Sequence, residues 1–287
     1  DAGTAIRGLS HCRQRPRENL LMHATTAITD YVAAVWRCRY FWFSLVKNDL
    51  RTRYHRSLLG LGWSLLNPLA MTAVLCTVFH RLWGLPISEY GPFVLSGLAF
   101  WGFISTCTLQ GCRCFYQAET YIRQYPAPLV IYPLRTALGA GFHLVIALCV
   151  VLAATWWFQG LGNLGALWSL LPTLLVLFVL GWSLAILAGV ANVMFPDMQH
   201  LLEVGLQILF YATPILYKAE MLRERGQGWL VDLNPMAVFL DCLRHPLLEG
   251  QPPTLALLGQ ACLWGLLAAM ASGVCLARWQ RRLVFLL

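Results

Sequence analysis

Residues 136–196 read TALGAGFHLVIALCVVLAATWWFQGLGNLGALWSLLPTLLVLFVLGWSLAILAGVANVMFP, without one charged side chain. A membrane-spanning helix needs ~20 apolar residues, so this run holds two spans. The glycine-rich stretch 159–165 supplies the turn between them. Only helices and closed barrels satisfy every backbone group in lipid, and barrel strands alternate polar and apolar residues. This run is continuously apolar, so it predicts helices.

The same pattern, followed outward in both directions, predicts four further spans. The six candidate spans are residues 58–79, 92–111, 136–158, 167–190, 201–216 and 254–277. Composition agrees, because 58% of the chain is hydrophobic and 12% is charged, whereas a soluble domain carries about 25% charge. We therefore expect an all-α integral membrane protein with six transmembrane helices, and composition excludes a water-soluble enzyme.

Lysine and arginine placement predicts the orientation of these spans. Sixteen of the 21 basic residues lie on the side that holds residues 1–56, the loop after the second span and the C-terminal tail. The positive-inside rule then places both termini in the cytoplasm. This bias and anionic lipid headgroups account for the net charge of +8. Nucleic-acid binding is disfavoured, because the basic residues flank spans and form no separate domain.

Three regions are expected along the chain: a cytoplasmic segment (1–57), the transmembrane domain (58–277) and a cytoplasmic tail (278–287). Within the first, residues 28–50 have apolar residues at helical spacing, which indicates an amphipathic helix in the membrane interface. The alternative is a soluble helix packed on a partner. In the loop after the second span, Glu119 and Arg123 stand i,i+4 on a short helix.

Residues 218–253 form the longest extracytoplasmic stretch, and its apolar pieces are too short to span. Asn234 followed by Pro235 is a favourable helix start. We expect two short re-entrant or surface helices between spans five and six. Non-helical backbone at membrane depth must be shielded by protein or line a wet cavity, so this region is a gate candidate.

Small residues recur every fourth position in two spans and predict close helix packing, within the chain or between copies. The two ridges are Gly181, Ala185, Gly189 and Ala261, Gly265, Ala269, Gly273, Ala277. The phosphate-cradling pattern G-x-x-x-x-G-K-[ST] is absent, so ATP hydrolysis is not expected in this chain. No acidic residue stands mid-span, which argues against ion coupling. The scattered cysteines predict packing residues and not a metal site.

Four segments resemble one known family of proteins. They are residues 45–69 (LVKNDLRTRYHRSLLGLGWSLLNPL), 192–197 (NVMFPD), 213–217 (TPILY) and 233–236 (LNPM), the last followed by Arg244 and residues 247–250 (LLEG). In this order they resemble the permease subunits of ABC exporters for polysaccharides and polyol phosphates, which export O-antigen, capsule or teichoic acid chains. The resemblance covers the chain from about Phe43 onward. The family pattern usually has a basic residue where Pro196 stands here.

The resemblance implies a location and a set of partners. It implies a multi-pass protein of the bacterial cytoplasmic (inner) membrane, two copies of this subunit and two copies of a separate ABC ATPase. That ATPase would bind ATP and Mg, and this chain would hold no cofactor. A cytoplasmic coupling helix would map to residues 115–125 and dock into the ATPase through Glu119, Tyr121, Ile122 and Arg123.

A lipid-linked polysaccharide needs a protein-lined conduit, because burying sugar hydroxyls without partners costs several kcal/mol. Conduit candidates are Trp63, Phe79, Trp83, Trp101, Phe103, Phe115 and Tyr116; interfacial belts and core packing are the alternative roles of such aromatics. Contacts to a lipid pyrophosphate or headgroup fall to Arg51, Arg53 and Arg56, and positive-inside topology alone also explains them. Gate candidates are Asn234, Pro235, Asp241 and Arg244.

Three other functions are compatible with parts of this pattern. An ABC exporter of drugs or lipids would have the same fold. A membrane scaffold or assembly factor would have no stable ATPase partner. An intramembrane enzyme is disfavoured, because the spans carry no Ser–His pair, metal cluster or mid-span acid.

Overall fold

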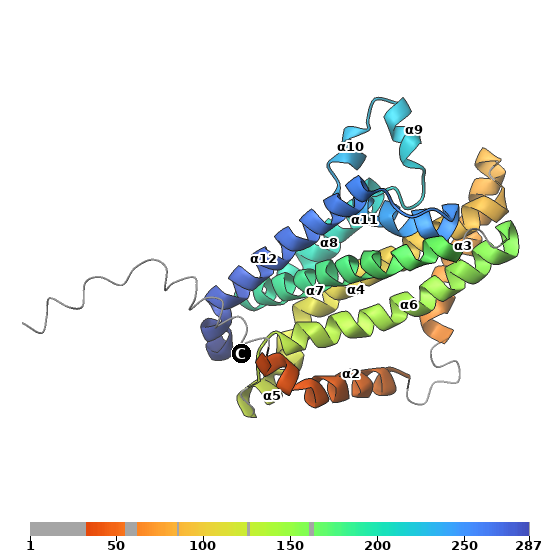
Figure 1. The fold of residues 1–287 in the computed structure, drawn as a ribbon. Coiled ribbons are helices and arrows are strands. Elements are labelled where there is room, and N and C mark those ends of the chain that lie inside the picture. The colour runs from red at the N-terminus through yellow and green to blue at the C-terminus, as the bar shows by residue number, and fades with distance from the viewer. Residues whose placement is uncertain (1–32, 55–61, 85, 125–126, 161–163, 287) are drawn as a thin grey trace, which may run out of the picture.

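Four long helices form the body of the protein. The computed structural model describes residues 33–54, 62–84, 86–124, 127–160 and 164–286, and every element in these ranges is helical (Figure 1). The four long helices are α4 (Ile87–Gln117), α6 (Ile131–Gln159), α7 (Leu170–Met194) and α12 (Leu255–Leu286). α4 packs against α6 and α7, and α7 packs against α12. The expected all-α class is confirmed.

These four helices are long and apolar enough to cross a membrane, α7 together with the preceding 3-10 turn η1 (Leu164–Ser169). The other two predicted spans correspond to α3 (Gly62–Trp83) and α8 (Met198–Ala212). With 15 residues, α8 is about 22 Å long, which is shorter than the ~30 Å hydrocarbon core. The sequence predicts six spans. Among the described residues, four helices are both long and apolar enough to cross a membrane.

The first ridge of small residues brings α7 against α4, which confirms close packing within the chain. A Cβ atom built at Gly111 would lie 2.6 Å from Cα of Ala185, and one at Gly181 would lie 2.5 Å from Cζ of Phe103. Such distances leave no room for a side chain. The second ridge, on α12, is mixed: a Cβ at Gly265 would lie 3.1 Å from Val176, whereas one at Gly273 would meet nothing within 4 Å.

The two ends of the bundle differ in architecture. At one end, α2 (Arg39–Tyr54) lies against α6, and α5 (Glu119–Gln124) and the C-terminal end of α12 lie close by (Figure 1). Their apolar side chains share one buried cluster with the ends of α4 and α7. Of the predicted interface helix, residues 28–32 lie outside the described residues, and residues 33–37 are helical before the turn that precedes α2.

At the other end, short helices follow the break after α8. They are α9 (Ala219–Glu224), α10 (Trp229–Asp232), α11 (Pro235–Arg244) and the π-helical turn η2 (His245–Glu249). Figure 1 shows α9 and α10 projecting beyond the bundle, while α11 lies across the ends of the long helices. Most of α11 is buried, and it packs against α4, α7 and α12.

Candidate functional site

The break after α8 is the first part of the candidate site, and local sequence explains it. A residue that precedes proline avoids helical backbone angles. Thr213 precedes Pro214 and is extended (φ −93°, ψ 138°), so α8 ends at Ala212. The Thr213 hydroxyl donates to the carbonyl of Leu209 at 2.7 Å and closes the last turn. The chain then runs through 213–216 without regular structure, which leaves backbone carbonyls that need partners.

Asn234 joins this break to the start of α11. Its side-chain oxygen accepts from the backbone N–H of Met236 at 2.9 Å, with Pro235 in the first turn, so the predicted helix cap is confirmed. Its amide nitrogen donates to the Thr213 hydroxyl at 2.9 Å. Asn234 is buried, so one side chain both begins α11 and fixes the end of α8.

Arg244, at the end of α11, holds the same break from the other side. Its guanidinium donates to the carbonyls of Pro214 at 2.7 Å, Ile215 at 3.1 Å and Phe93 at 3.2 Å. The group also lies 3.6 Å from the centre of the Phe93 ring. The residue is 6% exposed, and a buried charge is tolerated only when its donors are satisfied in this way.

Arg244 remains positively charged although it is buried. Burial lowers the pKa of the guanidinium to about 9, and the neighbouring Asp241 carboxylate opposes that shift. The group is thus protonated at neutral pH. Tyr90 of α4 completes the arrangement, because its hydroxyl donates to the carbonyl of Leu216 at 2.8 Å. We call Tyr90, Asn234, Arg244 and residues 213–216 the Arg244 clamp.

A cavity of about 870 Å³ lies beside the Arg244 clamp. Its walls come from the start of α4, the segment 216–224 and the end of α11 with η2. Both signs of charge line it, including Glu89, Glu220 and Asp241 against Lys218 and Arg223. Burial raises the pKa of the Asp241 carboxyl above its usual value, and the nearby Arg244 offsets only part of this rise. The four predicted gate residues therefore lie together: Asn234 and Arg244 in the clamp, Pro235 between them in α11, and Asp241 in the cavity wall.

The predicted coupling residues lie at the opposite end, on α5. Arg123 and Glu119 form the expected i,i+4 ion pair at 2.9 Å, and both side chains are substantially exposed. Ile122 packs into the buried cluster at this end, whereas Tyr121 is 41% exposed. The Tyr121 ring also contacts the edge of Phe41 on α2, with centroids 6.0 Å apart. One face of α5 is therefore polar and exposed, and Ile122 packs its other face against the buried cluster.

The predicted conduit aromatics whose side chains the structure describes do not gather at one place in a single chain. Phe103 and Phe115 are buried in the packing of α4, while Tyr116 is 43% exposed. Trp101 packs edge-to-face on Phe210 of α8 at 5.5 Å. Phe79 packs on Tyr90 at 5.8 Å. Trp63 and Trp83 stand near the two ends of α3, and their side chains are outside the described part of the structure.

The predicted headgroup arginines are described in part. Arg51 is exposed on α2, the side chain of Arg53 is not among those described, and Arg56 lies outside the described residues. Sequence reasoning missed a different arginine contact, the ion pair of Arg135 on α6 with Asp49 on α2. The two residues stand 86 positions apart, so no local spacing pointed to the pair.

Comparison with known proteins identifies the family. The ABC-2 type transporter family model matches residues 40–248, and this chain belongs to that family. The O-antigen export system permease protein RfbA of Klebsiella pneumoniae is 24% identical over 72% of this chain and 79% of its own length. The protein of that name from Myxococcus xanthus is 27% identical over 81% and 92%. The polysialic acid transport protein KpsM of Escherichia coli is 20% identical over 72% and 81%.

Proposed function

We propose that this chain is the permease subunit of an ATP-driven ABC exporter. In this proposal two copies form a channel that carries a lipid-linked polysaccharide of the O-antigen, capsule or teichoic acid type across the bacterial cytoplasmic membrane. Two separate ATPase subunits bind ATP and Mg. The observation that carries the proposal is the family match over residues 40–248, together with relatives whose names are those of polysaccharide export proteins.

The geometry of the two ends supports this division of labour. α5 has an exposed polar face, and its buried face packs with α2, α4 and α12. This arrangement suits a helix that transmits movement from a docked ATPase. The Arg244 clamp holds an irregular segment beside a charged cavity at the opposite end, which suits an exit for a hydrated chain. The full proposal has six crossings with both termini in the cytoplasm, α3 and α8 serving as the first and fifth spans.

The transported chain itself sets requirements that some predicted residues meet. Sugar hydroxyls in hydrocarbon cost several kcal/mol without partners, so the path must be lined by protein and water. The partly exposed aromatics Phe79, Trp101 and Tyr116 are the proposed lining, because ring faces accept sugars of different identity. Arg51, Arg53 and Arg56 are the proposed contacts for the lipid pyrophosphate.

The first test is gentle purification of the tagged chain from its native membranes, followed by mass spectrometry of the co-purified proteins. A stoichiometric ATPase with a Walker motif is the expected result. ATP turnover of the recovered complex should then rise with lipid-linked glycan and not with drugs. Recovery of the chain alone, in detergents that preserve such complexes, would instead indicate a scaffold protein, and stimulation by drugs or simple lipids would indicate another class of exporter.

A further inference from the structure

Two cavities lie in line along the groove between α4 and α6. The first, of about 60 Å³, is near the cytoplasmic end in the proposed orientation and has polar and apolar walls in nearly equal share; we call it the polar cavity because Asp49 and Arg135 line it. The second, of about 420 Å³, which we call the apolar cavity, has more apolar than polar wall: Met71, Leu98 and Leu144 line it together with the polar residues Asn67, Ser105 and Thr106. His143 lines both cavities, so they adjoin.

The order of these cavities follows depth in the membrane. At a rise of ~1.5 Å per residue, Arg135 lies about 6 Å along α6 from its start at Ile131. On the same scale, Ala147 at the far end of the second cavity lies about 24 Å along the helix. In the proposed orientation the polar cavity therefore begins nearer the headgroups, and the apolar cavity extends deeper into the hydrocarbon. A phospholipid has its polar and apolar parts in the same order.

The apolar cavity is bounded toward the surrounding lipid by α3. That helix packs mainly on α4 and makes few contacts with α6. Its residue Met71 lines the cavity and is 48% exposed, so the cavity wall is also part of the outer surface. An acyl chain has a lateral path from the bilayer between α3 and α6. The cavity volume falls within the ~300–1,000 Å³ range of small-molecule sites.

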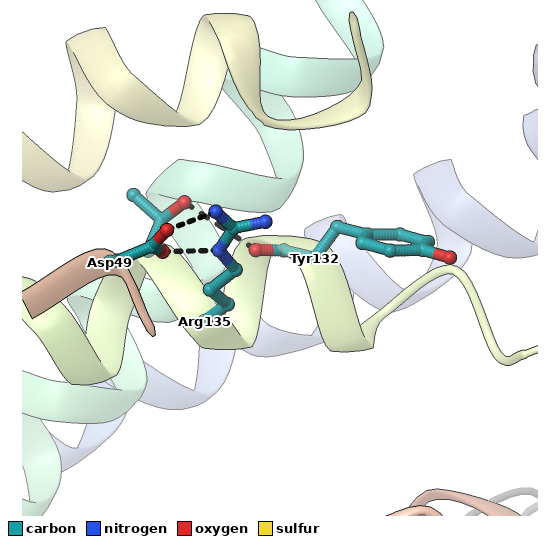
Figure 2. A network of polar contacts seen from close by, with 4 residues as sticks. Asp49, Tyr132 and Arg135 are labelled. Atoms are coloured by element: carbon teal, nitrogen blue, oxygen red, sulfur yellow. Dashed lines mark hydrogen bonds and ion pairs between the residues drawn. The ribbon is translucent and has the colours of Figure 1, made fainter. Parts of the chain in front are cut away.

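The polar cavity contains an anion-binding edge that is occupied by the protein's own carboxylate. Nε and Nη2 of Arg135 donate to the two oxygens of Asp49, as Figure 2 shows. Figure 2 also shows the Tyr132 ring directed away from this pair. The Arg135 side chain is 18% exposed and that of Asp49 is 42% exposed. A phosphate presents two oxygens to a guanidinium in the same bidentate geometry.

We propose that the two cavities form one site for an anionic phospholipid of the surrounding membrane. One acyl chain occupies the apolar cavity, and the lipid phosphate takes the place of Asp49 on Arg135. Exchange of the internal carboxylate for the lipid phosphate releases the end of α2 from α6. The site lies within one chain, and its apolar cavity shares Trp101 with the proposed conduit. Its phosphate ligand is Arg135 and not one of the arginines proposed for the transported lipid.

The test measures lipid retention by the purified full-length chain in detergent, using native mass spectrometry with phosphatidylglycerol and with phosphatidylcholine of identical acyl chains. The wild type should retain more phosphatidylglycerol than phosphatidylcholine. Arg135→Gln should lower phosphatidylglycerol retention roughly tenfold, because a charge-assisted pair is lost. Asp49→Asn should raise it, because the competing carboxylate is gone.

A cavity-filling variant tests the acyl-chain part. A Cβ at Gly102 meets nothing within 4 Å, and this residue lines the apolar cavity, so Gly102→Leu should fill it and reduce retention of both lipids. Gly205→Leu on α8 is the matched control, because a Cβ there also meets nothing within 4 Å and the residue is outside both cavities. Thermal unfolding of each variant without added lipid identifies any folding defect.

Several results would overturn the proposal. If Asp49→Asn unfolds like the wild type but retains less phosphatidylglycerol, the Asp49–Arg135 ion pair has only a structural role. Unchanged retention in Gly102→Leu would remove the acyl-chain site. Displacement of phosphatidylglycerol by an equimolar polyprenyl phosphate would assign the site to a carrier lipid. Binding is measured without ATPase or glycan, so a negative result leaves the export proposal standing, and failure of export leaves the lipid site standing.

Discussion

Arg244 belongs to α11, and its guanidinium contacts two other parts of the chain: α4 and the break at Pro214 and Ile215. Each guanidinium nitrogen has a carbonyl or hydroxyl partner, from Pro214 at 2.7 Å to Ser96 at 3.4 Å. A Cβ at Gly97 would lie 3.0 Å from Nη2 of Arg244, so α4 leaves just enough space for the group. Removal of the arginine would leave several buried carbonyls without donors.

We therefore predict that Arg244→Leu destabilises the extracytoplasmic segment by roughly 1–3 kcal/mol, the usual cost of leaving a buried polar group without its hydrogen-bond partner. Arg244→Lys should not restore stability, because an ammonium group cannot reproduce the planar fork. Thermal unfolding in detergent, with limited proteolysis between residues 213 and 250, measures the effect. Arg225→Ala is the matched control, because Arg225 is exposed in the same segment. A Leu variant as stable as this control would contradict the clamp.

At the scale of the helices, the close contact between α4 and α7 is possible because glycine, which has no side chain, stands on both helices where they meet. Gly111 and Gly189 approach each other closely: a Cβ at Gly189 would lie 2.9 Å from the carbonyl oxygen of Gly111. Apolar surface gives helices little reason to associate in lipid, so this close backbone contact is a main source of α4–α7 stability.

Gly111→Val should separate α4 from α7 and lower the thermal stability of the purified chain markedly, because a Cβ there would lie 2.6 Å from Cα of Ala185. Overpacking typically costs about 1–3 kcal/mol, and backbone contact leaves less room to adjust than side-chain contact does. Gly205→Val on α8 is the comparison, since a Cβ there meets nothing within 4 Å. Equal melting temperatures for the two variants would show that the helices can move apart at little cost.

The short helix α5 leads to a different kind of prediction. Exchanging its ion pair, Glu119→Arg with Arg123→Glu, keeps two opposite charges at i,i+4 and should leave the fold intact. It reverses the charge pattern that the outer face offers to the proposed ATPase. We expect unchanged thermal stability and a loss of coupling between ATP hydrolysis and export. Normal export in this double variant would remove α5 from the coupling role.

Local features were the ones that the sequence could predict. The charge-free run 136–196 became α6 and α7, Asn234 became a helix cap, and Glu119 paired with Arg123. Contacts between distant segments could not be predicted, because helix rotation is set by packing. The Asp49–Arg135 pair is one such contact. The early end of α8 was missed because hydropathy outweighed the backbone restriction that Pro214 imposes on Thr213.

At the scale of the whole molecule, the two ends define an axis. α5 and the end of α12 lie at one end, and α9, α10 and α11 lie at the other (Figure 1). The Arg244 clamp joins α11 to the start of α4 and to residues 213–216. Large apolar side chains are exposed along α3, α6, α7, α8 and α12 between these ends. Contiguous apolar surface of this kind is typical of proteins whose solvent is lipid.

The proposed topology can be tested by labelling with a membrane-impermeant thiol reagent. Gln227→Cys, in the exposed turn between α9 and α10, should react from outside the cytoplasmic membrane. Thr120→Cys, exposed on α5, should react only after the membrane is permeabilised. The unsubstituted chain is the control for reaction of the native cysteines. Labelling of both positions from the same side would require an even number of crossings between them and would contradict the three crossings of the proposed arrangement.

The length of α8 also has a consequence for the membrane itself. Its exposed side chains, including Leu201, Val204 and Ile208, are apolar, so if α8 is the proposed fifth span, lipid would cover them over only about 22 Å. A helix shorter than the hydrocarbon thickness is accommodated when the bilayer thins beside it, at a modest elastic cost per ångström. The membrane along α8 is therefore expected to be thinner than elsewhere. The free energy of inserting the protein then depends on the acyl-chain length of the surrounding lipids.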